Sequence, residues 1–320
     1  MDDVHQIDIP TPFDLGRVHC YLFDGEGVTV LDPGPETDEA LAACRAGLHA
    51  RGYSISDVDR ILLTHPHADH FGLARQIVER SGARIIAHRD ATRVLVDPRS
   101  YAEQCRRFFR SFFESMGVPN QTIESAISRF TDSLEYKQPV KVDQELADGD
   151  CIDIGVEMTA IHTPGHDPGS ICFVSLSDKV AFTGDHVLGH ITPNPLITLS
   201  PDTANERTRS LPSYLESLHR IQHVDIDVAH AGHGDPIKDL DGRVQNILDH
   251  HHDRKERIAG LVERHGPTTA YELMTDLFPR ITTKQILPGM SEVIGHLDLL
   301  EDEGRVEING EAGIYRYALV

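Results

Sequence analysis

The segment Thr64-His65-Pro66-His67-Ala68-Asp69-His70 constrains this 320-residue chain more than any other feature. It follows the short apolar run Ile61-Leu62-Leu63 and places three imidazoles and one carboxylate close together in the sequence. A loop at a strand end can aim alternate side chains at one point, and neutral imidazole and carboxylate are good ligands for zinc and related metals. Crowded polar groups would cost desolvation energy without a partner. The segment therefore predicts a metal site, in preference to a chance surface cluster.

Three later segments repeat this chemistry, because each follows an apolar strand pattern and carries a glycine-flanked His or Asp. They are Thr163–Ser170 with His166, Thr183–His186 with Asp185, and Ala231–Asp235 with His233. Any one of them alone is typical of an ordinary turn. Four such loops in one chain favour a shared site.

Together the four loops resemble the metallo-β-lactamase superfamily, over residues 5–240. The resemblance implies an α/β fold, an αββα sandwich, that holds two divalent metal ions. Zinc is the expected metal, with iron or manganese as alternatives that the same ligand types suit. The resemblance assigns the first metal to His65, His67 and His166, the second to Asp69, His70 and His233, and makes Asp185 the bridge between them.

Other residues near these loops are open to two interpretations. Asp32, in Leu31-Asp32-Pro33-Gly34, either supports the histidine loop, as its counterpart in the family does, or is a plain turn residue. His230 competes with His233 for the last ligand position, and the glycines beside His233 favour His233. His190 is expected in the pocket, acting in catalysis with Asp69 and Asp185.

Two further histidine groups are expected to lie outside the site. His162 and His186 are interpreted as core or supporting residues. The run His250-His251-His252 is interpreted as a solvated linker, because adjacent residues on a helix do not face one another.

The chain is expected to divide into two domains. Residues 1–240 would form the catalytic domain, with a helical insertion at about 95–145, and residues 241–320 a small winged-helix-like domain that packs against it. Helical patterns followed by two strand patterns around Asn309-Gly310, a strong hairpin signal, suggest that second domain. Residues 99–135 of the insertion are a candidate lid over the site, a question that the sequence leaves open. Within them, the stretch Arg106–Phe113 either supplies an apolar pocket wall with a cationic anchor or is a helix packed on the core.

Composition bears on partners and location. A net charge of −21 and the run Glu301-Asp302-Glu303 argue against nucleic-acid binding and leave a small molecule as the expected partner. No apolar run is long enough for a membrane span, the start Met1-Asp2-Asp3 is acidic, and five scattered cysteines lack paired spacing. A cytoplasmic location is therefore expected, and a homodimer is a guess that the sequence leaves open.

The expected activity is hydrolysis by a dinuclear metal site in which a metal-bridging hydroxide attacks the substrate, most plausibly an ester or thioester. No G-x-S-x-G motif offers a serine nucleophile instead. Single-strand endoribonuclease activity is the first alternative, and a mononuclear iron enzyme similar to persulfide dioxygenases is the second. Hydrolysis of β-lactams ranks below hydrolysis of esters and of RNA, because a cytoplasmic enzyme would not be the first to meet such drugs.

Overall fold

Two β-sheets form the centre of the structure, a computed structural model that describes residues 4–203, 205–311 and 313–320. The acidic start Met1–Asp3 thus lies outside the described residues. The first sheet has the order β1 (His5–Ile9), β2 (Val18–Gly25), β3 (Gly27–Leu31), β4 (Val58–Leu62), β5 (Arg84–His88), β6 (Gln144–Leu146). The second has the order β11 (Val228–Ala231), β10 (Val180–Gly184), β9 (Ile171–Ser175), β8 (Glu157–His162), β7 (Cys151–Asp153).

The two sheets share an apolar core. Tyr21, Phe23 and Leu62 of the first sheet pack in one cluster with Phe173 and Phe182 of the second. Strands β4, β9 and β10 are buried along most of their length, and their sequences are accordingly rich in apolar residues rather than strictly alternating.

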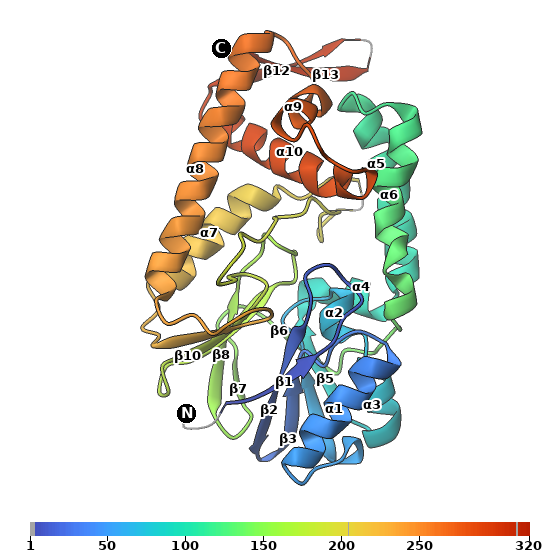
Figure 1. Cartoon of the computed structure of the whole chain (residues 1–320), viewed down its shortest axis with the longest axis vertical. Helices are drawn as coiled ribbons and strands as arrows, with labels where there is room; N and C mark the ends of the chain where they lie inside the picture. The colour runs from blue at the N-terminus through green and yellow to red at the C-terminus, as the bar shows by residue number, and fades with distance from the viewer. Residues whose placement is uncertain (1–3, 204, 312) are drawn as a thin grey trace.

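Helices cover the outer faces of both sheets. On the first sheet lie α1 (Asp38–Ala50) and α3 (Ala74–Ser81), and on the second lie α7 (Ser210–Gln222) and the first part of α8 (Leu240–His265). Helix α1 begins where the Thr37 hydroxyl accepts a hydrogen bond from the Ala40 amide, and it buries Cys44 and Leu48. The expected αββα sandwich is confirmed, and Figure 1 shows its layers in the lower part of the view.

The helical insertion contains α4 (Thr92–Val96), α5 (Pro98–Ser115) and α6 (Asn120–Asp132). Helix α5 begins at Pro98, and the preceding Asp97 caps it by accepting from the Ser100 amide. Phe109 and Phe113 are fully buried in a core shared with the C-terminal helices. Figure 1 shows α5 and α6, in green, beside the red α10.

The C-terminal part follows α8 with α9 (Ala270–Leu277), α10 (Ile286–Asp302) and the hairpin β12 (Val306–Glu311) and β13 (Ile314–Leu319). The hairpin turn is not where the sequence indicated. Asn309 and Gly310 lie within β12, paired with Arg316 and Tyr315, and Gly313 takes the positive φ of 82° near the turn. The boundary at residue 240 and the winged-helix character of this part stay predictions.

The run His250–His252 is not a linker, because all three residues lie on α8. His251 is buried, and its Nδ1 lies 3.2 Å from Nε2 of His296 on α10. The expectation failed because it considered whether these rings could face one another and not what each could face on a neighbouring helix. Among the described helices, none has the length and apolar character that crossing a membrane requires.

Short elements complete the chain. They are α2 (Ala68–Phe71) and the 3₁₀ turns η1 (Ile55–Asp57), η2 (Arg89–Ala91), η3 (Leu134–Tyr136) and η4 (Thr283–Gln285).

Candidate metal centre

The loops that carry the candidate ligands meet at one edge of the sandwich. Strands β3 and β4 run parallel, as do β10 and β11, so the loops that follow the strands of each pair leave at the same end of their sheet. The Ile171 amide donates to the carbonyl of Thr64 at 2.9 Å, which joins the two sheets there. Gly184 is required at this junction, since a Cβ on it would lie 2.5 Å from the Thr64 hydroxyl oxygen.

Seven predicted metal-site side chains converge at this edge. Three groups have ligand atoms within 4.8 Å of one another: His65, His67 and His166; His65, His70 and Asp185; and Asp69, His70 and His233. The two oxygens of Asp185 divide between the groups: Oδ2 lies 3.8 Å from Nε2 of His166, and Oδ1 lies 3.5 Å from Nε2 of His70. Asp185 thus lies between the two predicted sets.

Four of the histidines are fixed by the ring nitrogen that faces away from the cluster. Nδ1 of His166 donates to the Asn194 carbonyl (3.1 Å), and Nδ1 of His233 donates to the Arg17 carbonyl (2.6 Å). Because each carbonyl only accepts, these contacts place the proton on Nδ1 and leave the Nε2 lone pair toward the cluster. Such outer contacts are typical of histidines that ligate metals.

Asp32 fixes the other two histidines. Its Oδ2 accepts from Nδ1 of His70 at 2.9 Å and from the Thr64 hydroxyl at 2.6 Å, while Oδ1 accepts from the Thr64 amide at 2.8 Å. The same hydroxyl oxygen lies 3.0 Å from Nδ1 of His65. Of the two roles considered for Asp32, the structure gives it the supporting one. Its φ of 52° also shows it at a tight turn, in a conformation that aspartate tolerates.

A cation fits the inward-facing atoms. Nε2 of His65, His70 and His233 and Oδ1 of Asp185 are buried and have no hydrogen-bond partner among the described residues. Orphaned buried polar groups cost free energy, and four in one place require an explanation. Imidazole nitrogen and carboxylate oxygen are the donor set that zinc, iron and manganese accept.

The electrostatics divide the imidazoles of the cluster: burial favours the neutral form of His65 and His67, whereas the carboxylates favour positive charge at His70 and His233. A cation bound beside these carboxylates would replace the protons on His70 and His233. Burial, followed by the neighbouring imidazoles, holds the pKa of His65 and of His67 well below the ordinary value, so both are neutral. Burial alone would lower the pKa of His70, but the carboxylates of Asp185 and Asp32 outweigh it and raise that pKa. Burial would likewise raise the pKa of Asp185, yet the surrounding imidazoles keep it well below its usual range.

The cluster forms the floor of a cavity of about 630 Å³, the central cavity. Part of its wall comes from the helical insertion, which the sequence offered as a candidate lid, while segment 196–198 and the start of α10 were not anticipated. Two lysines face this cavity, Lys137 and Lys284, and four acidic residues line it in addition to those of the cluster: Asp14, Asp132, Glu135 and Asp167. The apolar and aromatic walls comprise Phe13, Leu15, Val94, Tyr101, Phe130, Tyr136, Leu196, Ile197 and Leu287.

The stretch Arg106–Phe113 does not line the central cavity, which α5 reaches through Pro98, Tyr101 and Ala102 instead. Of the two roles considered for the stretch, the packed helix is the one observed. The sequence gives one weak indication of the residues that do line the central cavity. The chain has only six lysines, so Lys137 could have been singled out for its rarity.

The remaining histidines are separated from the cluster. His190 is exposed and lines a different hollow with Gly234 and Arg243, which removes the reason for a catalytic role. His230 stacks on Phe182, with ring centroids 5.2 Å apart, and it is His233 rather than His230 that lies with Asp69 and His70. The ring of His186 packs edge-on against Tyr214.

The ring of His162 stacks on that of His88 with centroids 3.8 Å apart. His162 is half-buried, and its Nε2 contacts the Pro168 carbonyl at 2.8 Å. His186 is buried, but neither of its ring nitrogens has a hydrogen-bond partner among the described residues.

Comparisons with known proteins point to one family. The profile described as "Metallo-beta-lactamase superfamily" matches residues 13–233. The probable metallo-hydrolase YqjP of Bacillus subtilis (strain 168) is 30% identical over 303 residues, which cover 94% of this chain and 93% of that protein. A crystal structure of a metallo-beta-lactamase family protein from Thermus thermophilus is 31% identical, with a TM-score of 0.83 over 100% of this chain and 99% of that one.

A third relative is more distant. The atrochrysone carboxyl ACP thioesterase of Aspergillus fumigatus is 25% identical over 313 residues. The match covers 92% of this chain and 57% of the fungal protein.

Proposed function

This chain belongs to the metallo-beta-lactamase superfamily and is a metal-dependent hydrolase, and from that premise we propose that it hydrolyses a carboxylic thioester or ester with two divalent cations, zinc first among them. The observation that carries the proposal is the set of four buried, unpartnered atoms on His65, His70, His233 and Asp185. They lie beside His67, Asp69, His166 and Asp185, which line a cavity large enough for a small organic substrate.

The extent of the cluster supports two cations rather than one, because its ligand atoms fall into three overlapping groups and His67 and His166 share no group with Asp69 and His233. His65, His67 and His166 would hold the first, and Asp69, His70 and His233 would hold the second. Asp185 would bridge them, because its two oxygens face different sets. When bound, the two cations would lower the pKa of a shared water and withdraw charge from the substrate carbonyl.

The protein's own residues would contribute positioning and proton transfer. Asp69 lines the cavity, and its Oδ2 lies 3.5 Å from Nε2 of His233. With a pKa well below its usual range, Asp69 is a carboxylate that can accept a hydrogen bond from the attacking water and orient it. Asp185 would do the same from the opposite side. The catalytic pair proposed is therefore Asp69 and Asp185, without His190.

The walls of the central cavity support an acyl substrate. Tyr101, Phe130 and Leu196 offer apolar surface to an acyl chain or ring and would exclude water from it. The ammonium groups of Lys137 and Lys284 are available to a polar or anionic portion of the same substrate. The thioesterase name of the Aspergillus relative fits this substrate class.

The same walls give no support to a single strand of RNA. Two lysines among four carboxylates do not form the basic path that a phosphate backbone needs, and the chain as a whole carries a charge of −21. We therefore keep RNA cleavage only as an arm of the test.

The test begins with metal content. Purified protein is stripped with a chelator, reconstituted with Zn²⁺, Mn²⁺ or Fe²⁺, and analysed by elemental analysis before assay. Two cations per chain are expected, and a single iron would favour the persulfide-dioxygenase alternative. Each form is then assayed with an aryl thioester, the matching oxygen ester and a labelled single-stranded RNA.

The variants Asp185→Asn and His67→Ala are assayed alongside. Loss of one group that acts in the reaction is expected to lower kcat/KM by about 10²- to 10⁴-fold. Matched controls are Asp202→Asn and His49→Ala, since both residues are exposed and neither lines the central cavity or belongs to the cluster. Full thioesterase and esterase activity in Asp185→Asn would overturn the proposal, as would cleavage of RNA alone.

A further inference from the structure

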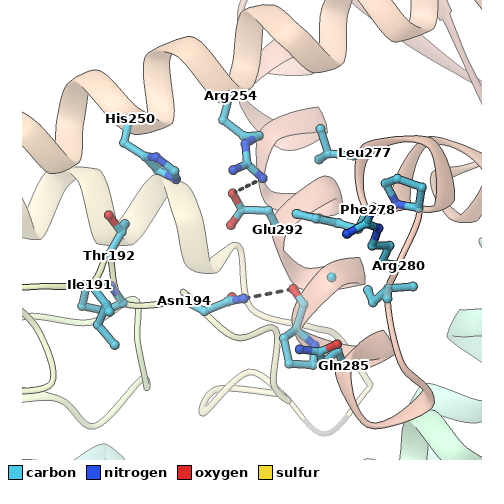
Figure 2. Close-up of a pocket in the computed structure, with 15 residues that line it drawn as sticks. Ile191, Thr192, Asn194, His250, Arg254, Leu277, Phe278, Arg280, Gln285 and Glu292 are labelled. Atoms are coloured by element: carbon cyan, nitrogen blue, oxygen red, sulfur yellow. Dashed lines mark hydrogen bonds and ion pairs between the residues drawn. The ribbon is translucent and has the colours of Figure 1, made fainter. Parts of the chain in front are cut away.

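A second cavity, of about 690 Å³, lies where the C-terminal helices meet the sandwich. We call it the junction cavity. Its walls are segment 191–194, the middle of α8, the loop 277–281 after α9, and the first turns of α10. Figure 2 shows these elements surrounding it, with the labelled side chains of α8 and α10 on one side and segment 191–194 on the other. None of the seven cluster residues lines it.

The charges that face the junction cavity are mostly positive, in a strongly acidic protein. Arg254 and Arg280 line it, and Glu292 is the one acidic residue among its described lining residues. Nη1 of Arg254 lies 3.3 Å from Oε1 of Glu292, a partly buried ion pair drawn as a dashed line in Figure 2. Arg280 has no hydrogen bond or ion pair to any described residue, and it is exposed. The cavity therefore has one cationic group in excess.

Donors remain available after the internal ion pair is formed. The Arg254 guanidinium carries five N–H donors, and its orientation is fixed because it lies 5.2 Å from the centroid of the Phe278 ring. The Gln285 side chain adds amide donors to the same cavity. The rest of the lining is largely apolar and includes Ile191, Leu277 and Pro288. A ligand with an anionic group and an apolar body would match both the donors and the apolar lining of the junction cavity.

One residue connects this cavity to the metal cluster. Asn194 lines the junction cavity, and its Nδ2 donates to the Pro288 carbonyl on α10 at 3.0 Å, as Figure 2 shows. The backbone carbonyl of the same residue accepts from Nδ1 of His166 at 3.1 Å. A molecule that moves α10 against segment 191–194 would therefore change the position of the acceptor that orients His166.

From these observations we infer that the junction cavity is an effector site that binds a small organic carboxylate and changes the rate of hydrolysis through Asn194. The carboxylate head lies between Arg280 and Arg254, and the apolar body lies against Phe278 and Pro288. No covalent step is involved.

The first arm of the test measures binding. The probe is 2-naphthoate, titrated into metal-free protein by isothermal titration calorimetry, with neutral 2-naphthamide as the control for charge. Saturable binding of one naphthoate that is stronger than naphthamide binding is expected. Arg280→Gln should weaken naphthoate binding about threefold to fivefold, as one partly exposed charge contact would, and Thr192→Trp, which fills the cavity, should abolish it.

Two further variants distinguish binding at the junction cavity from binding at the central cavity. Lys137→Gln removes a cationic side chain from the central cavity and should leave naphthoate affinity unchanged. If this variant loses naphthoate binding, the probe occupies the central cavity and the inference is overturned. Arg254→Gln combined with Glu292→Gln removes the internal ion pair without leaving one buried charge alone. It should weaken binding at least as much as Arg280→Gln does.

The second arm measures turnover of the metal-loaded enzyme against naphthoate concentration. The turnover rate should change with the same half-saturating naphthoate concentration as binding. Asn194→Ala should still bind naphthoate but lose most of the change in rate, because it keeps the backbone carbonyl and removes the side-chain contact to Pro288. Binding without any change in rate would overturn the effector role. This arm rests on the proposed hydrolysis, but the binding arm does not, so failure of one is distinguishable from failure of the other.

Discussion

Oδ2 of Asp32 accepts a hydrogen bond from Nδ1 of His70 at 2.9 Å, inside the protein and away from solvent. This contact orients the imidazole and leaves its Nε2 toward the cluster. Replacement by Asn offers an amide in place of a charged acceptor. We expect Asp32→Asn to weaken binding of the second cation about 10- to 100-fold, with a smaller effect on the first.

Chelator competition followed by elemental analysis measures the Asp32→Asn effect, with Asp202→Asn as the matched exposed control. Equal occupancy of both positions in Asp32→Asn and the native protein would show that the contact is dispensable.

Gly232 gives a second test of the cluster geometry. A Cβ at this position would lie 2.5 Å from Oδ1 of Asp185 and 2.8 Å from Cε1 of His70. Gly232→Ala should therefore displace the carboxylate and lower kcat/KM at least about tenfold, because small displacements of reacting groups are costly. The control is Gly260→Ala on α8, where only the end of Arg264 lies near the added carbon. Native activity in Gly232→Ala would contradict the bridging position of Asp185.

Removal of metal should destabilise the folded protein. Without cations, the inward-facing nitrogens of His65, His70 and His233 are buried and have no hydrogen-bond partner among the described residues. A cation at 100 times its Kd adds about 2.7 kcal/mol to the free energy of unfolding, which corresponds to a rise of about 4 °C in Tm for a chain of this length. Calorimetry with EDTA, then with excess Zn²⁺, measures this difference. The shift should shrink in Asp185→Asn, and no shift in the native protein would count against a metal centre.

The His251–His296 pair predicts loss of stability in acid. Burial lowers the pKa of His251 to about 2 and that of His296 to about 4. Arg254 and His250 on α8 also disfavour a charge on this pair, and the Tyr214 ring of α7 packs against His251. Because both folded pKa values lie below the unfolded value, the unfolded chain takes up protons first as the pH falls below about 6.5. Stability is therefore full above that pH and is lost as the pH falls toward 4.

Each histidine of the pair would contribute about 1.4 kcal/mol per pH unit in that window. Urea unfolding of metal-free protein between pH 7.5 and 5.0 measures the loss. His251→Asn should be less stable at pH 7.5 but should lose less stability on acidification. His49→Asn, at an exposed position, should follow the native curve. If the free energy of unfolding falls equally with pH in His251→Asn and in the native protein, the His251–His296 pair is not the cause of the acid sensitivity.

The metal cluster was predictable because its signal is local. Residues 64–70 carry four candidate ligands on one loop after one strand, and strand ends determine where such a loop points. His166, Asp185 and His233 were predictable because each also follows a strand. The supporting role of Asp32 was one of two options, and only its contacts with Thr64 and His70 decide between them.

The walls of both cavities were not predictable from local pattern. Lys137, Leu196 and Leu287 come from distant parts of the chain and meet only through packing of the insertion against the C-terminal helices. His190 was misplaced because the chain turns away from the cluster after Asp185. The Asn309-Gly310 turn was misplaced because strand register, which depends on the partner strand, outweighed a local preference.

The hydrogen bond between His233 and the Arg17 carbonyl has a consequence for how the protein is made. Under the proposed ligand set, a nascent chain offers the histidine loop early but cannot retain the second cation until residue 233 has left the ribosome and returned to the first strands. The second cation would then bind only after residues 1–233 have folded, and not while they are folding. A cell short of zinc would accumulate folded protein without metal rather than partly folded chains.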